Sequence, residues 1–257
     1  MIGHVDYHIV HHCNFHCAGC NQFSCLAQPW FVPYEQFYEE WKTVRDKGLQ
    51  FGEIRLLGGE PLLHPELGRL LTAIRELIPN TKIVVYTNAI LLKKRKEELL
   101  PVFNDNKITL FISKYSELKL DYAELERGFN DVTSTSATSF MNTCLHKNPD
   151  FNAEEMYRQC NNSQSWQCRF LKENRLYTCS MIPNLCFLIQ YFPELHDTPL
   201  GQMNIEENGI DIRTHTVGEI EEFLKHSIPA CAFCNVPHAK RFHGWYPSEY
   251  KITEWIE

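Results

Sequence analysis

The sequence predicts an α/β fold with a parallel sheet over residues 1–140, followed by a smaller cysteine-bearing module over residues 141–257. Two observations predict this division. Strand-like and helix-like segments alternate through the first part, which is typical of βαβ units. After Phe140 this periodicity ends, and five cysteines fall between Cys144 and Cys186. A chain of 257 residues is long enough for a large domain with such an appendage.

The elements of the first part follow from their hydrophobic spacing. The expected strands are Val5–Val10, Glu53–Leu57, Lys82–Thr87, Lys107–Ser113 and the less regular Asp131–Thr138. The expected helices are Pro33–Lys47, Pro65–Ile78, Leu91–Phe103 and Tyr122–Phe129. The first helix ends at Gly48, a residue suited to a C-cap. Because parallel strands end at one edge of the sheet, we expect the loops that follow them to converge there.

The second part is predicted from turn residues and one amphipathic pattern. Residues 168–179 are expected to form a hairpin with Glu173 and Asn174 at its turn, because Asn tolerates the left-handed conformation. Two further segments resemble short strands, Gly201–Ile205 and Gly209–Ile212. Val217–His226 is expected to be a helix that leads into the sequence CAFC.

Charge and composition argue against two classes of partner, nucleic acid and membrane. The net charge of −7 argues against nucleic acid, which requires a clustered basic surface. No secretory segment and no apolar run of membrane length is found, so we expect a cytoplasmic protein with no membrane partner. Eleven cysteines in a reducing compartment favour metal binding over disulfides.

Two short motifs indicate the chemistry. Cys13, Cys17 and Cys20 form the pattern C-x₃-C-x₂-C directly after the first expected strand. Three thiolates suit zinc, copper(I) or an iron–sulfur cluster, and a zinc site completed by Cys25 or a histidine is one reading of this loop alone. The second motif, Gly-Gly-Glu-Pro over residues 58–61, follows the second expected strand.

Together the two motifs resemble the radical SAM superfamily, over about residues 1–140. The resemblance implies a partial (β/α)₆ barrel, whose sixth strand the sequence itself does not indicate. It implies that Cys13, Cys17 and Cys20 hold a 4Fe–4S cluster whose open iron binds S-adenosylmethionine. An electron from an external low-potential donor of flavodoxin or ferredoxin type would then cleave this cofactor reductively and give a 5′-deoxyadenosyl radical.

The same resemblance assigns roles to residues around the cofactor. Gly58 and Gly59 would let the backbone approach the methionine moiety, and Glu60 would accept hydrogen bonds from its amino group. Pro61 would stiffen the turn. Four residues at strand ends are expected to contact the ribose and carboxylate, with ordinary strand-end capping as the alternative: Thr87, Asn88, Ser113 and Lys114.

The chain departs from the family pattern at Gly19. Many family members carry an aromatic residue just before the third cysteine, where it flanks the adenine. Phe15 or Phe23 could take this place.

The later cysteines resemble a twitch module, the shortened form of the SPASM extension that holds an auxiliary cluster. The expected ligands of a second 4Fe–4S cluster are Cys168, Cys179, Cys231 and Cys234, with Cys160 as an alternative to Cys168. Zinc is the competing metal, because four cysteines also make zinc sites. Strict family patterns place a glycine in the hairpin, where this chain has Asn174.

The remaining candidates are expected to be structural. Cys25, Cys144 and Cys186 would be small buried apolar residues, or alternatively donors of a hydrogen atom to a substrate radical. His11, His12 and His146 are expected to be structural rather than catalytic.

The resulting hypothesis is a radical SAM enzyme with oxidoreductase-type chemistry on a small hydroxylated substrate, such as a sugar, a cyclitol or a glycan precursor. A radical SAM maturase that modifies a peptide or protein is the alternative. The first strand begins at Val5 and leaves no room before it for a peptide-recognition domain, which favours the small molecule. A non-catalytic zinc-binding module is the second alternative, and the sequence assigns no catalytic residue.

Overall fold

The computed structural model describes residues 1–141 and 143–257, which form two compact units. Unit 1 comprises residues 1–15 and 29–138, and unit 2 comprises residues 16–28 and 139–257. The segment 16–28, which is predicted to lie in the first domain, therefore belongs to the second unit. The reason is local packing, because Phe23 and Leu26 are buried in the hydrophobic core of unit 2.

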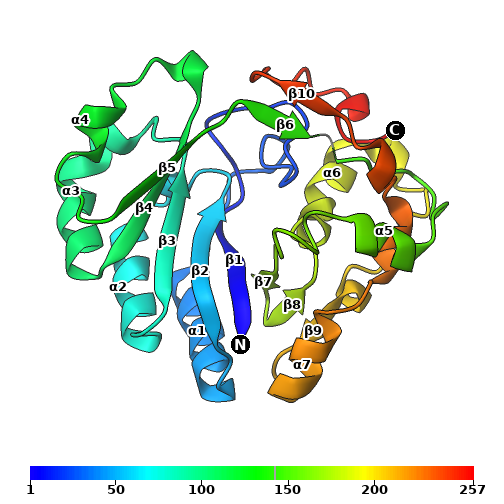
Figure 1. Ribbon diagram of the computed structural model, residues 1–257, viewed down its shortest axis with the longest axis horizontal. Helices are drawn as coiled ribbons and strands as arrows, with labels where there is room; N and C mark the ends of the chain where they lie inside the picture. Colours follow the sequence, from blue (N-terminus) through cyan, green and yellow to red (C-terminus); the bar gives the residue numbers. More distant parts are fainter. Residues whose placement is uncertain (142) are drawn as a thin grey trace. The chain divides into compact units, whose positions relative to one another are not determined.

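Unit 1 contains a five-stranded parallel sheet in the order β5-β4-β3-β2-β1, which confirms the predicted parallel α/β fold (Figure 1). The strands are β1 (Ile2–Val10), β2 (Phe51–Gly58), β3 (Lys82–Thr87), β4 (Ile108–Lys114) and β5 (Val132–Ser136). The helices are α1 (Tyr34–Lys47), α2 (Leu67–Leu77), α3 (Leu92–Asp105) and α4 (Tyr122–Glu126). As predicted, α1 ends at Gly48, whose φ of 75° lies in the left-handed region.

The two faces of this sheet differ in character. Tyr7 of β1 lies with its ring centroid 5.5 Å from the rings of both Phe37 and Trp41 of α1, so its face is the apolar one. Because side chains alternate along a strand, three buried polar residues of β1 lie on the opposite face. These residues are His4, Asp6 and His8.

The described residues of unit 1 form five strands, so the sixth strand implied by the family resemblance is not found within this unit. The segment after β5 instead forms β6 (Ser139–Met141), which pairs antiparallel with β10 (Arg241–His243) in unit 2. Phe140 of β6 stacks on Phe242 of β10 with ring centroids 5.6 Å apart. This cross-strand contact gives the short segment a partner other than β5.

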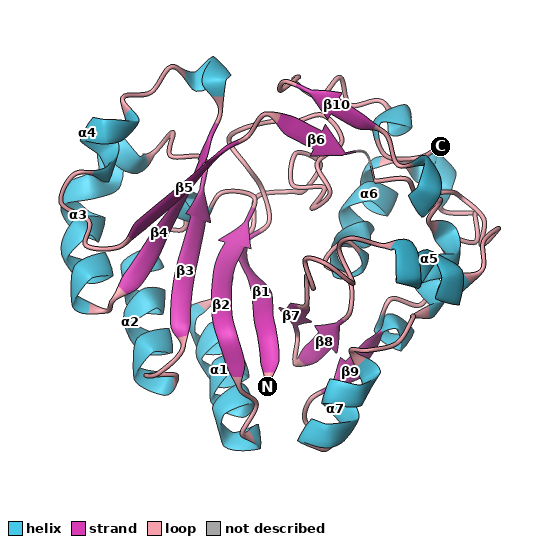
Figure 2. Cartoon of the chain, in the orientation of Figure 1, coloured by secondary structure: helices cyan, strands magenta, loops and turns pink. Residues whose placement is uncertain are grey.

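Unit 2 consists of short elements joined by long loops (Figure 2). Its hairpin is confirmed, with Glu173 and Asn174 at φ values of 52° and 59° in the turn. Besides β6 and β10, its strands are β7 (Phe170–Lys172), β8 (Arg175–Tyr177) and β9 (Gly209–Asp211). The helices are α5 (Ala153–Gln159), α6 (Leu185–Tyr191) and α7 (Val217–Phe223).

Two expectations for unit 2 need correction. The segment Gly201–Ile205 is not a strand, because Gln202 N donates to Thr198 O and Met203 N donates to Leu200 O in successive turns. Helix α7 begins as expected, at a capping box between Thr216 and Glu219, but it ends at Phe223. No helix in the described part of the chain combines the length and apolar character that a membrane span requires.

Arg75, in the last turn of α2, holds the loops that precede β3 and β4. Its guanidinium donates to four backbone carbonyl oxygens at 2.7–3.1 Å: those of Asn106, Lys107, Pro79 and Thr81. The planar fork of donors reaches both loops at once, which a single ammonium group cannot do.

We therefore expect Arg75→Lys to lower the free energy of unfolding by about 1–2 kcal/mol, because several backbone carbonyl groups, two of them in part-buried hydrogen bonds, lose their donor. Urea denaturation measures this change. The matched control is Arg69→Lys in the same helix, where the side chain is 53% exposed and its ion-pair partner is Glu66. The control should change stability by less than about 0.5 kcal/mol, and an equally small change in Arg75→Lys would contradict the assignment.

Candidate functional site

The turn after β2 lies directly along the segment that leads to Cys13. Gly59 N donates to Val10 O at 3.0 Å, and Glu60 N donates to His12 O at 3.2 Å. A Cβ atom at Gly59 would lie 1.9 Å from His12 O and 2.6 Å from Cys13 N, so only glycine fits.

Gly58 is constrained in the same way. Its φ is 147°, and an added Cβ would lie 1.9 Å from Val10 O. In this structure Gly58 and Gly59 thus allow the turn after β2 to lie against the backbone at the end of β1. Their expected approach to the methionine moiety stays a prediction.

The carboxylate of Glu60 is buried among three donors, with a residue exposure of 1%. Its Oε1 accepts from Leu62 N at 3.0 Å and from Thr87 Oγ1 at 2.7 Å, and its Oε2 accepts from Asn88 N at 2.9 Å. Burial raises the pKa of Glu60 to about 7, although these hydrogen bonds lower it. The structure therefore brings together Glu60, Thr87 and Asn88, three of the residues predicted to bind the cofactor.

Asn88 connects this network to Cys13. Its Nδ2 donates to Asn14 Oδ1 at 2.9 Å and lies 3.8 Å from Cys13 Sγ. Phe15 N also donates to Cys13 Sγ, at 3.3 Å. N–H donors around a sulfur atom stabilise its thiolate form, which is the form that ligates metal.

The other predicted cofactor residues of unit 1 lie in different surroundings. Pro61 is buried at the start of a 3₁₀ helix, Pro61–Leu63. The ammonium of Lys114 pairs with Glu126 of α4 at 2.6 Å and lies 5.2 Å from the ring centroid of Tyr122. Ser113 stands in register with Thr135 of β5. Roles for Ser113 and Lys114 in cofactor binding stay predictions.

Cys17 and Cys20 lie in the segment 16–28 of unit 2, where a later segment of the chain holds them. Residues 16–18 pair with residues 246–248, since Ala18 N donates to Tyr246 O at 3.0 Å and Ser248 N donates to His16 O at 2.9 Å. The loop that carries these cysteines is thus fixed by backbone hydrogen bonds on a partner far along the sequence.

The same packing explains Gly19. Its φ is 61°, and an added Cβ would lie 3.3 Å from Glu254 O. An aromatic residue would be strained there. Phe23, one of the two suggested substitutes, is fully buried in the core of unit 2, and Phe15 packs edge-on against Tyr115 with ring centroids 4.7 Å apart.

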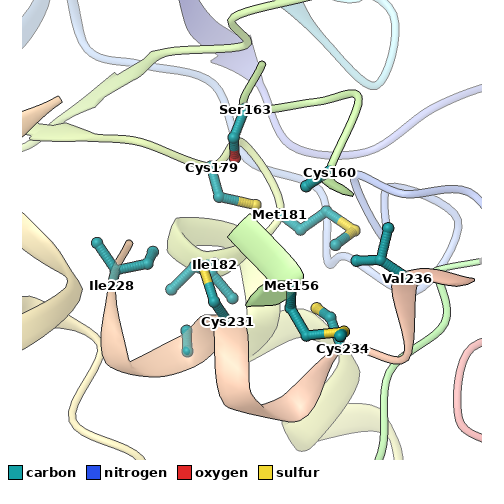
Figure 3. Close-up of a pocket in the computed structure, with 11 residues that line it drawn as sticks. Met156, Cys160, Ser163, Cys179, Met181, Ile182, Ile228, Cys231, Cys234 and Val236 are labelled. Atoms are coloured by element: carbon teal, nitrogen blue, oxygen red, sulfur yellow. The ribbon is translucent and has the colours of Figure 1, made fainter. Parts of the chain in front are cut away.

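A second group of cysteines lines one cavity within unit 2 (Figure 3). Cys160 caps the end of α5, Cys179 follows β8, and Cys231 and Cys234 lie in and just after the 3₁₀ helix Pro229–Phe233. The rest of the lining is mostly apolar and comprises Met156, Ser163, Met181, Ile182, Ile228, Ala230 and Val236.

Cys168, which we predicted as a ligand, is not among the residues that line this cavity, whereas Cys160 is. The chain turns between the two positions. Gln164 N donates to Cys160 O, and Cys168 N donates to Asn162 O at 2.7 Å. The spacing of the hairpin cysteines in the sequence suggested Cys168, but this spacing does not reveal the turn between Cys160 and Cys168.

Burial keeps the thiols of Cys179 and Cys231 neutral unless a cation is present. It raises the pKa of Cys231 to about 11 and raises the pKa of Cys179 further, with neighbouring cysteines adding to both shifts. A metal ion or cluster removes this penalty because it binds the thiolates directly. Four cysteines around one apolar cavity are the donor set of a closed metal centre of the iron–sulfur or zinc type.

The remaining cysteines lie outside this lining. Cys144 is buried, and its thiol shares a hydrogen bond with that of Cys234. Cys186 packs against the core of unit 2, and Cys25 Sγ lies 3.9 Å from Cys17 O. Sequence reasoning left Cys160 as an alternative only, because nothing in the sequence shows that α5 ends at this cavity.

The comparisons with known proteins agree with the N-terminal motifs. Residues 7–122 match the model of the Radical SAM superfamily. Over 101 residues the chain is 32% identical to "GTP 3',8-cyclase" of Sulfurimonas denitrificans, covering 37% of this chain and 31% of that protein. The same-named protein of Sulfurovum sp. is 31% identical over 101 residues, which are 37% of this chain and 30% of that protein. These alignments span about a third of the relatives' length.

Two solved structures of BtrN are similar over nearly the whole chain. The complex with AdoMet and 2-DOIA has a TM-score of 0.51 and 15% identity, and covers 91% of this chain and 93% of that one. The open conformation has a TM-score of 0.50 and 16% identity, with coverages of 91% and 92%. At this identity the likeness shows the fold alone.

The raised pKa of Glu60 makes stability depend on pH. Between the ordinary value of 4.5 and about 7, the folded state binds this proton more tightly than the unfolded state does. The contribution of Glu60 to stability is complete below pH 4.5 and is lost as the pH rises towards 7. The free energy of unfolding should fall by up to about 3 kcal/mol over this range. Urea denaturation of the metal-free protein at several pH values measures it.

The control is Glu60→Gln, which does not titrate and turns an amide N–H towards the buried N–H of Asn88. At pH 5 the variant should be less stable by about 1–3 kcal/mol, and this difference should shrink towards pH 7.5. Asp6, whose pKa burial also raises to about 7, contributes to both proteins and cancels in the comparison. Parallel pH profiles for the two proteins would contradict the assignment.

Proposed function

We propose, from the premise that residues 7–122 form a radical SAM domain, that this chain is an enzyme acting on a small hydroxylated molecule. A 4Fe–4S cluster on Cys13, Cys17 and Cys20, with S-adenosylmethionine bound, would supply reductive cleavage of that cofactor and hydrogen-atom abstraction from the substrate. The observation that carries this proposal is the buried Glu60 network connected through Asn88 to Cys13.

The residues of unit 1 are suited to bind and orient such a cofactor. Glu60 offers a carboxylate already fixed by three donors, and a cationic amino group would make a charge-assisted contact with it. Because the carboxylate is pinned, little conformational freedom would be lost on binding. Asn88 keeps its amide N–H directed at Cys13 Sγ and Asn14.

The choice of a polar substrate is supported by the helix-free face of the unit 1 sheet. Arg55 of β2 lies in register with Asp6, and its Nη1 lies 3.0 Å from His4 Nε2. The same guanidinium donates to Glu53 at 2.5 Å and lies 5.6 Å from the ring centroid of Tyr86. A face built from imidazole, carboxylate and guanidinium groups suits hydroxyl-bearing molecules better than apolar ones.

Asp6 offers an acceptor on this face. In the described residues its Oδ1 has no hydrogen-bond donor, although the residue is only 6% exposed. Burial raises its pKa to about 7, against the lowering effect of Arg55. Such a carboxyl group can accept from a hydroxyl when ionised and donate to one when protonated.

The cavity of unit 2 would hold a second 4Fe–4S cluster, with Cys160, Cys179, Cys231 and Cys234 as its ligands. Four thiolates would leave no open iron, so this centre suits electron transfer or structure rather than cofactor binding. After hydrogen-atom abstraction, oxidation of a hydroxyl-bearing carbon to a carbonyl releases one more electron and one proton; such a cluster would accept the electron, and solvent would accept the proton. The electron that starts the reaction would come from an external low-potential flavodoxin or ferredoxin.

The reaction is tested by anaerobic incubation with dithionite and S-adenosylmethionine. We expect 5′-deoxyadenosine from the reconstituted protein and none from Cys13→Ala, which removes one iron ligand. With deuterated sugars and cyclitols as candidate substrates, deuterium should appear in 5′-deoxyadenosine. Deuterium transfer from peptides alone would favour the maturase alternative, and absence of 5′-deoxyadenosine from protein with full iron content would overturn the enzyme proposal.

The second centre is tested by counting metals after anaerobic reconstitution. The unchanged protein should hold about eight irons per chain, Cys160→Ala about four to five, and Cys168→Ala about eight. Cys186→Ala is the control for loss of a cysteine outside the cavity. A count of four irons and one zinc per chain would show that the second centre is a zinc site and not an iron–sulfur cluster. If Cys168→Ala loses iron and Cys160→Ala does not, the fourth ligand is Cys168, as the sequence predicts, and not Cys160.

A further inference from the structure

Two tryptophans from one late segment of the chain donate hydrogen bonds to the cysteine loop of unit 2. Trp245 Nε1 donates to Cys17 Sγ at 3.1 Å, and Trp255 Nε1 donates to Cys20 O at 3.0 Å. The two contacts differ in the acceptor. One reaches the sulfur atom that would bind iron, and the other reaches a backbone carbonyl.

The position of Trp245 is fixed by the backbone around it. The next residue, Tyr246, accepts from Ala18 N at 3.0 Å, and Pro247 forms a β-bridge with Cys17. The indole therefore reaches the cysteine from a strand-like segment already paired with the loop. Since the indole N–H is only a donor, its partner must supply electron density, which a thiolate does.

We propose that Trp245 is a positioning residue that raises the reduction potential of the N-terminal cluster through its hydrogen bond to Cys17 Sγ. This inference rests on the proposed cluster at Cys13, Cys17 and Cys20. Reduction by one electron, supplied by the external low-potential donor, adds negative charge that is shared by the iron-bound sulfur atoms. An N–H donor at one of these atoms stabilises the reduced form more than the oxidised form.

The same argument gives Trp255 a different role. Its side chain is buried in the core of unit 2, 5.9 Å from the ring of Phe192, and its N–H satisfies a carbonyl group. Removal of this bond weakens the packing of the loop but leaves the sulfur donors unchanged. Trp255 is thus the matched control within the same segment.

The test is a redox titration of the reconstituted holoprotein followed by electron paramagnetic resonance, using the signal that changes when S-adenosylmethionine is added. Trp245→Phe keeps an aromatic ring and removes the N–H. We expect the equilibrium constant for reduction to fall about tenfold, which is about 59 mV towards more negative potential for one electron. Trp255→Phe should leave the potential unchanged.

An unchanged potential in Trp245→Phe, or equal shifts in both variants, would overturn the proposal. If Trp245→Phe does not retain the cluster, benzothienylalanine at position 245 supplies an isosteric ring without the N–H, and the same shift is expected. Failure of the proposed function can be told apart from failure of this inference. If the proposed function is wrong, the unchanged protein shows no signal that responds to S-adenosylmethionine.

Discussion

Two backbone hydrogen bonds between the turn after β2 and the end of β1 constrain the rest of the site. They hold Gly59 against Val10 and Glu60 against His12, at a separation that no side chain permits. Glu60 is thereby directed into the sheet edge, where the end of β3 supplies donors to its carboxylate. The approach is possible only because parallel strands end together, so the fold and the glycines are needed jointly.

Much of unit 1 could be predicted from the sequence because its signals are local. Hydrophobic spacing located the strands and helices, and Gly48 marked the end of α1. The motif at residues 58–61 likewise indicated a cofactor site, and residues 7–122 match the model of the Radical SAM superfamily that the two motifs resemble. Each of these features depends on residues that are close in the sequence, within one or two helices or strands.

What could not be predicted depends on contacts between distant segments. Nothing near Cys160 shows that α5 ends at a cavity formed with residues 229–234, so hairpin spacing favoured Cys168. The segment 16–28 reads as a loop of the first domain, yet Phe23 and Leu26 pack with side chains more than a hundred residues later. The short strand β6 found its partner in β10 for the same reason. Tertiary packing overrides local pattern in each case.

The pairing of residues 16–18 with residues 246–248 also has a consequence for the timing of biosynthesis. Trp245 lies 228 residues after Cys17, and synthesis of that length takes on the order of 10–50 s at roughly 5–20 residues per second. Until those residues have left the ribosome, the loop that carries Cys17 and Cys20 lacks the strand that fixes it. The first cysteines to be made are therefore among the last to reach their final geometry, and iron delivered during translation would meet an unformed site.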